Sequence, residues 1–251
     1  MSELPRVVVS VVAGVDGRVA LSRGERLLDA DADRRWRSGW PGDVEELLEA
    51  ASSAVEERYR PTVVLEGSGT FVGDDAPAAA CDEDDTPAEV LLADYLPKRT
   101  PKWFAVVDGR GRVDWSFFGD AQTSLLVLVC ESTPLPYLAR LRRDGVPYLV
   151  AGQARVDLRV ALLRLREALG AQCVVSHAGG GLNGALLRAG LVDEVHVVTV
   201  PMLVGGLCTP SVADGPPLPV GGTPVRLRTV DVTVGAQGTV WAHYEVIDAR
   251  G

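Results

Sequence analysis

Short runs of consecutive apolar residues recur along the chain, and most of them do not alternate with polar positions. Continuous runs of this kind are typical of strands that are covered on both faces, as in a parallel sheet. They predict seven strands, at residues 6–13, 61–67, 103–108, 125–131, 147–152, 173–178 and 194–201. Two later segments, 224–235 and 239–247, alternate more regularly and predict a terminal antiparallel pair.

Helical spacing of apolar residues appears between the predicted strands. Residues 43–59 place their apolar side chains on one stripe, as a helix that packs against a sheet requires. Residues 157–170 repeat Leu at the same spacing, with Asp157 as the expected N-cap and Gly170 as the expected stop. A third, short helix is predicted over 183–190.

Strands and helices therefore alternate over the whole length, which favours a single α/β domain, residues 1–251, with a mainly parallel sheet. Residues 74–101 interrupt the alternation with an acidic, Pro-rich stretch that holds one helical patch. This stretch is either a plain surface insertion or a mobile flap near a site. Residues 213–224 form a long turn-rich connection rather than a domain boundary.

Charge and cysteine usage narrow the function classes. The net charge is −9, so the basic footprint of a nucleic-acid-binding protein is absent. The four cysteines are far apart, without CxxC pairs or a zinc-type histidine spacing, so we expect free thiols, no metal site and a reducing cytoplasmic setting. Cys130 and Cys173 lie in apolar runs and are interpreted as buried thiols. The first apolar run is too short to span a bilayer, and no membrane association is expected.

Two glycine clusters follow predicted strands. Gly179, Gly180 and Gly181 stand where a strand passes into a helix, and residues 67–70 (GSGT) end another strand. Without Cβ atoms the backbone N–H groups can approach a ligand, and a helix N-terminus attracts anions. A tight turn is the alternative explanation for either cluster. Because ligands gather beyond the carboxyl ends of parallel strands, both clusters can serve one dinucleotide.

Other enzyme classes fit the sequence poorly. The first strand is not followed by GxGxxG, and the P-loop pattern GxxxxGK[ST] is absent. Ser176 and His177 are adjacent in a predicted strand, so their side chains point to opposite faces and cannot form a nucleophile–base pair. His196 and His243 are interpreted as sheet histidines with satisfied ring nitrogens.

The run "GGGLNGALLRAGLVDEVHVVTVPMLVGG" resembles the end of the reductase domain of riboflavin biosynthesis, a family with a dihydrofolate-reductase-like fold. Three earlier stretches resemble further motifs of that family in the expected order: "VVAGVDGRVAL", "LEGSGTFVGDD" and "FAVVDGRGRV". The likeness covers nearly the whole chain, and its last run is the most specific.

The resemblance implies a central sheet of about eight or nine strands with flanking helices. It also implies NADPH as hydride donor and a homodimer. Carried over position by position, the resemblance assigns the cofactor to residues of four segments. These are Ala13, Gly14, Ser68, Gly69, Thr70, Asp74, Gly179, Gly180, Gly181, Leu182 and Asn183. The surface turn that holds Arg110 and Arg112 is a possible second contact for a 2′-phosphate.

The family reaction implies a ribosylamino-pyrimidine phosphate as substrate, with hydride transferred to the ribose C1′ carbon. Asp16 and His177 are the expected catalytic groups, and Arg58, Ser10 and His177 the expected substrate contacts. His177 stands where the family usually carries Glu or Asp, and the acidic residues after Asp74 replace an expected basic pattern. A related pterin-like or secondary-metabolite substrate, or a catalytically silent NADPH-binding protein, are therefore the alternatives.

Overall fold

A computed structural model describes residues 4–247, which separate into two compact units. The first unit holds residues 61–174 together with residues 4 and 5, and the second holds residues 6–60 and 175–247. The units therefore interleave in sequence. A single domain over 1–251 stays a prediction.

The described residues form nine strands, at the positions that the apolar pattern predicts. They are β1 (Arg6–Gly14), β2 (Val63–Gly67), β3 (Lys102–Val107), β4 (Thr123–Val129), β5 (Tyr148–Val150), β6 (Cys173–Ser176), β7 (Glu194–Val200), β8 (Leu227–Val234) and β9 (Val240–Val246). The predicted mixed α/β class, with a mostly parallel sheet and a C-terminal antiparallel pair, is confirmed.

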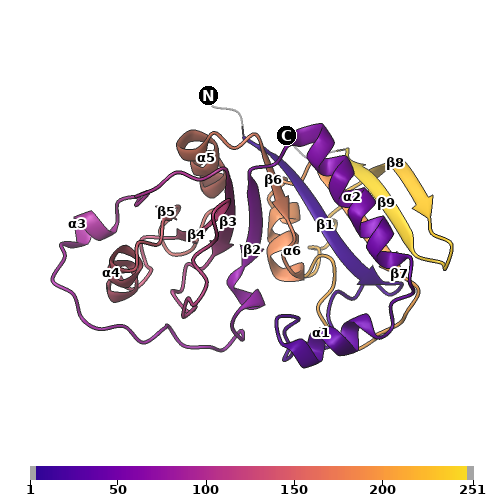
Figure 1. The fold of residues 1–251 in the computed structure, drawn as a ribbon, viewed down its shortest axis with the longest axis horizontal. Helices are drawn as coiled ribbons and strands as arrows, with labels where there is room; N and C mark the ends of the chain where they lie inside the picture. The colour runs from indigo at the N-terminus through magenta and orange to yellow at the C-terminus, as the bar shows by residue number, and fades with distance from the viewer. Residues whose placement is uncertain (1–3, 248–251) are drawn as a thin grey trace. The chain divides into compact units, whose positions relative to one another are not determined.

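Six α-helices and one 3₁₀ turn connect these strands within the described part of the chain (Figure 1). They are α1 (Ala30–Arg37), α2 (Val44–Tyr59), η1 (Ser68–Thr70), α3 (Ala88–Leu91), α4 (Leu135–Arg143), α5 (Leu158–Leu169) and α6 (Gly180–Arg188). The helix predicted at 157–170 is confirmed with both ends, because Asp157 caps it and Gly170 adopts a φ of 71°. The helix predicted at 183–190 begins earlier, at Gly180.

In the first unit, strands β5, β4, β3 and β2 pair in that order, and all three pairs are parallel. The helix α4 packs its buried side chains against this sheet, where Tyr137 and Leu138 join a core with Val106 and Val127. Burying such side chains contributes about 1.5–3 kcal/mol each. The stretch 74–101 holds only the single turn α3 as regular structure.

In the second unit, β1 pairs with β7 in parallel, and β7, β9 and β8 continue as antiparallel neighbours. The helix α2 covers one face of these strands, with Leu47 and Ala51 packed near Val198 and Trp241 (Figure 1). Two helices that the sequence did not predict, α1 and α4, are short, with eight and nine residues.

Candidate functional site

The turn between β6 and α6 presents bare backbone. Gly179 is the N-cap of α6 in an extended conformation, and among the described residues no side chain caps the helix. A Cβ placed at Gly179 or at Gly181 would have no atom within 4 Å. Both glycines are exposed. The first N–H groups of α6 therefore remain available to an anion, which the positive end of the helix dipole favours.

Gly180 has a different role from its two neighbours. A Cβ there would lie 2.2 Å from the carbonyl oxygen of Ser211, and one at Gly184 would lie 1.7 Å from that of Asp214. The backbone N–H of Asp214 also donates to the carbonyl of Gly180 at 2.8 Å. Gly180 is thus needed for close packing of α6 on residues 211–214, and its assignment to the cofactor stays a prediction.

Asn183 braces the same turn from inside. Its Oδ1 accepts a hydrogen bond from the Ser176 hydroxyl at 2.7 Å, and its Nδ2 donates to the carbonyl of Ala178 at 2.7 Å. Asn183 and Ser176 are both buried. Because both ends of the amide are bonded within the protein, Asn183 holds the glycine turn in shape, and Leu182 beside it is partly exposed. Ser176 is likewise unavailable as a nucleophile.

His177 follows β6 directly, beside the glycine turn, and its side chain is exposed. The protein atoms around it remove part of its hydration, which lowers the pKa of the imidazole below 6.5. The ring is therefore mostly neutral at pH 7 and offers one donor and one acceptor.

Asp16 links two of the sequence motifs within the second unit. Its Oδ2 accepts hydrogen bonds from the backbone N–H groups of Gly205, at 2.6 Å, and Val204, at 3.1 Å. These bonds, that of Gly205 first, lower the pKa of the Asp16 carboxyl, so the group is ionised at neutral pH. The geometry favours a positioning role for Asp16, which ties the turn after β1 to the loop after β7.

Ala13 and Gly14 end β1 beside this turn, and both are buried. A Cβ at Gly14 would lie 2.9 Å from the carbonyl oxygen of Met202 and 2.9 Å from the Asp16 carboxylate. The close approach of two backbone segments therefore explains this glycine without a ligand.

The second glycine cluster lies in the first unit, where β2 passes into η1. Ser68 is buried and its hydroxyl accepts a hydrogen bond from the Arg112 guanidinium at 2.8 Å. The Thr70 hydroxyl donates to Glu66 at 3.0 Å. A Cβ at Gly69 would meet nothing within 4 Å, so the open part of this corner is again backbone.

Arg112 holds the turn after β2 in place through its hydrogen bonds, a role that the sequence did not reveal. Besides Ser68, it donates to the carbonyls of Gly73, at 2.7 Å, and Asp74, at 3.1 Å. Burial lowers the pKa of its guanidinium. Since these contacts occupy Arg112, it is not available to a 2′-phosphate, whereas Arg110 in the same turn is exposed.

A buried carboxylate fixes the turn that carries Arg112. The Oδ2 atom of Asp108 accepts from the backbone N–H groups of Arg112 and Val113, at 2.8 and 3.0 Å, and from the Tyr137 hydroxyl at 3.0 Å. Trp115 in turn donates its indole N–H to Tyr137 at 2.7 Å. The only sequence signal for this network is an Asp directly after an apolar strand.

Glu66 is a second group that the sequence pattern does not reveal as a site residue. It is the fourth residue of β2, within an otherwise apolar run, and is half-buried. Burial raises the pKa of its carboxyl to about 7. A carboxyl group that titrates near neutral pH at the end of a strand is a candidate for proton transfer.

Two predicted substrate contacts lie elsewhere in the second unit. Arg58 is exposed in the last turn of α2, next to Tyr59, whose hydroxyl bonds to Glu194 at the first position of β7. Asp16 bonds the loop beyond the last position of β7, about 20 Å away at the rise of a strand. This separation argues against Arg58 as an anion anchor beside Asp16.

Ser10 lies in the middle of β1 and pairs with His196 of β7. Side chains at paired positions share a face, and Val12, two positions further along β1, packs under α2. Ser10 therefore points to the covered face of the sheet rather than to the strand ends.

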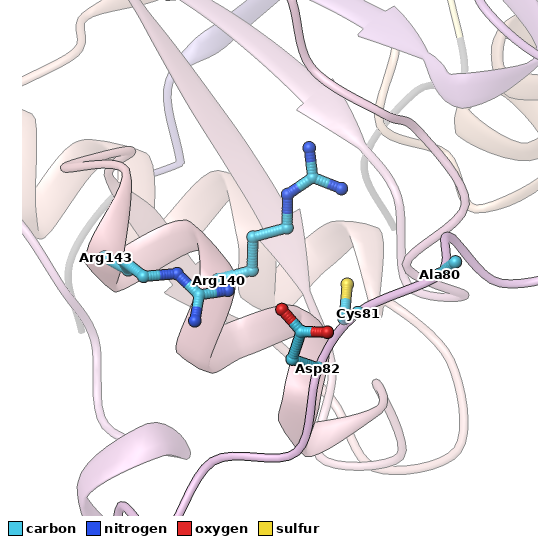
Figure 2. A pocket seen from close by; sticks show the side chains of 5 residues that line it. All are labelled: Ala80, Cys81, Asp82, Arg140 and Arg143. Atoms are coloured by element: carbon cyan, nitrogen blue, oxygen red, sulfur yellow. The ribbon is translucent and has the colours of Figure 1, made fainter.

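A cavity of about 240 Å³ in the first unit lies between α4 and the segment 80–82 (Figure 2). It is lined by Ala80, Cys81, Asp82, Arg140 and Arg143. A smaller apolar cavity of about 130 Å³ in the second unit includes Val9, Asn183 and Leu227. Neither has the size and polar lining of a dinucleotide site.

Among residues 4–247, no helix combines the length and the apolar character needed to cross a bilayer.

Comparison with known proteins gives consistent results. The family model of the RibD C-terminal domain matches residues 5–241. The 2,5-diamino-6-ribosylamino-4(3H)-pyrimidinone 5′-phosphate reductase of Methanothermobacter thermautotrophicus is 28% identical over 215 residues, covering 84% of each chain. The protein of that name from Archaeoglobus fulgidus is 27% identical over 216 residues, covering 84% of this chain and 87% of its own.

The solved structure of RibD from Acinetobacter baumannii has a TM-score of 0.61 at 20% identity. The match covers 97% of this chain and 58% of the Acinetobacter chain, which is therefore considerably longer. At this identity the likeness shows the fold alone, and it agrees with the dihydrofolate-reductase-like architecture that the sequence predicts.

Proposed function

Because this chain belongs to the family of the RibD C-terminal domain, we propose that it is an NADPH-dependent reductase of a ribosylamino-pyrimidine phosphate in riboflavin biosynthesis. The curated relatives from two archaea carry the name of that reductase. The structural observation that carries the proposal is the uncapped N-terminus of α6, where Gly179 and Gly181 leave the backbone open.

These residues fit a cofactor diphosphate. Exposed N–H groups at a helix N-terminus bind phosphate oxygens without side-chain cations, and bare glycines permit the close approach that a diphosphate needs. The buried pair Ser176 and Asn183 keeps those N–H groups in one orientation, so little ordering remains to be done on binding. Ala13, Gly14, Ser68, Gly69, Thr70 and Asp74 are assigned to the same cofactor on the family resemblance alone.

When bound, NADPH supplies a hydride to the C1′ carbon of the ring-opened ribose. The chain must then hold the substrate carbon close to the nicotinamide and deliver one proton. We assign His177 to the substrate, because it is the exposed polar side chain next to the glycine turn. Asp16 positions the loop after β7, and its bonded carboxylate is a poor proton donor.

Two groups can supply the proton. His177 has a lowered pKa, so only a minor part of it is protonated at pH 7. Glu66 has a pKa of about 7 and carries a proton in roughly half of the molecules at that pH. We assign the proton to His177, because it is separated from the proposed cofactor turn only by Ala178.

Two alternatives to this function remain: a different substrate, and NADPH binding without catalysis. Where the family places a carboxylate, His177 replaces a pure acceptor by a ring with one donor and one acceptor. This change favours a related heterocycle, such as a pterin-like compound, as an alternative substrate. A silent NADPH-binding protein is the second alternative, because the cofactor corner does not depend on His177.

We further propose that the chain acts as a homodimer in the cytoplasm. β8 is bonded to β9 alone among the described strands, and its Val230, Val232 and Val234 are exposed. An exposed apolar edge strand is suited to contact a second copy. The described residues contain no disulfide, which is compatible with a reducing compartment. Sedimentation velocity tests the oligomer: a monomer at micromolar concentration contradicts it.

The function is tested by following NADPH absorbance with the diaminopyrimidine ribosyl phosphate as substrate. Consumption that depends on this substrate supports the proposal. Consumption only with a pterin-like compound supports the first alternative, and binding of NADPH without turnover in a metabolite screen supports the second. Failure to bind NADPH overturns all three.

A further inference from the structure

A cluster of three buried, ionisable side chains lies in the second unit, at the end of the sheet opposite to the loop that Asp16 holds. Glu194 and His196 are two positions apart on β7, so they share one face of the strand. His243 of β9 is the direct antiparallel partner of His196. The sheet register thus gathers one carboxylate and two imidazoles from two neighbouring strands.

All three side chains are removed from solvent. The exposed fractions are 3% for Glu194, 2% for His196 and 7% for His243. Within residues 4–247, neither ring nitrogen of His196 has a hydrogen-bond partner, so the sequence-based view of His196 as a satisfied sheet histidine is wrong. Leaving a buried polar group unpaired costs about 1–3 kcal/mol, and a natural core rarely keeps one without a reason.

The two oxygens of Glu194 have separate partners. Oε1 accepts from the Arg6 guanidinium at 2.8 Å and from the Tyr59 hydroxyl. Oε2 faces the imidazoles, with His243 Nε2 at 3.0 Å and His196 Nε2 at 3.7 Å. The carboxylate is therefore oriented on one side and directed at two nitrogen atoms on the other.

These separations suit a shared metal ion. Zinc binds imidazole nitrogen and carboxylate oxygen at about 2.0–2.2 Å, so two ligand atoms around a tetrahedral ion lie about 3.3 Å apart. The separations of 3.0 and 3.7 Å lie on either side of that value, and the three donor atoms all lie within 4.8 Å of one another. The two imidazole rings stack with their centroids 4.1 Å apart, so a small rotation of each ring directs both nitrogens at one point.

We propose that Glu194, His196 and His243 form a binding site for a divalent transition-metal ion, with Zn²⁺ as the best match to two imidazoles and one carboxylate. Hard ions such as Mg²⁺ and Ca²⁺ prefer sites made of oxygen alone. A water molecule completes a tetrahedral shell. The ion fills the unmet hydrogen-bonding capacity of His196 and cross-links β7 to β9. The Arg6 side chain, 40% exposed, and Tyr59 cover the other oxygen of the carboxylate.

This site is separate from the proposed cofactor corner. It lies where β7 begins, whereas the loop that Asp16 holds follows the end of β7. The ion therefore stabilises the second unit and takes no part in hydride transfer.

The test is a titration of the chelator-treated, full-length protein with Co²⁺, followed by visible absorption. We expect one equivalent to give the intense d–d bands of a low-symmetry site, and Zn²⁺ to remove them. The thermal midpoint should rise with Zn²⁺, because an ion that binds only the folded state stabilises it. Absence of the bands in the wild-type protein overturns the proposal.

Three variants locate the ion. His243→Ala and Glu194→Gln should each lose the Co²⁺ bands and the Zn²⁺-dependent rise of the thermal midpoint. His177→Ala is the matched control, because it removes the one other histidine of the chain and should keep both signals. Loss in His177→Ala, or bands unchanged in His243→Ala, overturns the assignment.

Two further measurements do not depend on those variants being folded. Tyr59→Phe keeps the ring but removes the hydroxyl that orients Glu194, and should weaken Zn²⁺ binding about 10-fold or more, as loss of an outer-shell partner does. X-ray absorption of the zinc-loaded wild-type protein should show two imidazole ligands, and a shell without imidazole contradicts the site.

Discussion

The backbone of Gly180 faces that of Ser211 so closely that a Cβ at position 180 would lie 2.2 Å from the Ser211 carbonyl oxygen. Its neighbour Gly181 has no atom within 4 Å of the same point. The two adjacent glycines therefore differ: Gly180 is required by packing within the protein, whereas Gly181 borders open space.

Substitution of these glycines should separate stability from cofactor binding. Gly181→Asp places a negative charge at the open N-terminus of α6, so NADPH affinity should fall about 10-fold or more with little change in thermal stability. Gly180→Ala forces α6 away from residues 211–214 and should destabilise the protein by about 1–3 kcal/mol. NADPH fluorescence titration and thermal unfolding measure the two effects, and equal behaviour of both variants contradicts the distinction.

The pH profile of turnover should identify the proton donor. Because the pKa of His177 is lowered, a reaction that needs its protonated form should slow as the pH rises through a value below 6.5. His177→Asn should remove this limb and lower kcat by about 10²–10⁴-fold, with NADPH affinity nearly unchanged. If instead a limb near pH 7 persists in His177→Asn and disappears in Glu66→Gln, the role belongs to Glu66.

Glu66 should also make stability depend on pH. Its carboxyl ionises near pH 4.5 in the unfolded chain and near pH 7 in the folded protein, so the unfolded state releases its proton first as the pH rises. The contribution of Glu66 to stability is therefore complete below pH 4.5 and is lost by pH 7, a change of up to about 3 kcal/mol. Urea unfolding at pH 5 and pH 8 should show that Glu66→Gln is the more stable protein at pH 8 only.

The two arginines of the turn after β3 should behave differently. Arg112 donates three hydrogen bonds within the protein. Arg112→Ala should therefore lower the free energy of unfolding by about 2–4 kcal/mol, which urea unfolding measures. Arg110→Ala should leave stability unchanged. If Arg110 contacts the 2′-phosphate, this variant should bind NADPH more weakly and NADH equally well, and a parallel loss of both cofactors excludes that contact.

A variant of Arg58 tests whether this residue contacts the substrate, as the family resemblance implies. Because it lies at the end of β7 remote from Asp16, Arg58→Ala should keep the KM for a phosphorylated substrate within about twofold of the wild-type value. A KM that rises 10-fold or more would show that Arg58 binds the substrate after all. Arg159→Ala, at an exposed position of α5, serves as a charge-matched surface control.

The fold was largely readable from the sequence because strand burial leaves a direct trace. Continuous Val and Leu runs mark the buried strands, and the alternation in 224–235 and 239–247 marks the antiparallel pair. The helices α1 and α4 escaped prediction for physical reasons. α1 buries only Ala32 and Trp36, and α4 begins after Pro134, where a turn is an equally good expectation.

The site was readable only in part, because sequence shows where backbone is bare but not what braces it. The glycine clusters can be recognised directly in the amino-acid sequence. The partners of Asn183 and Ser68, and the contact of Gly180 with Ser211, depend on segments that meet only in three dimensions. The cluster of Glu194, His196 and His243 was missed for the same reason, since the pairing of β7 with β9 creates it.

The connection between β7 and β8 divides into two halves of unequal freedom. Ser211 and Asp214 fill the space left by Gly180 and Gly184, whereas every residue from Gly215 to Thr223 is exposed. The second half can thus vary in length or accept an inserted reporter domain. A single added residue in the first half would displace α6.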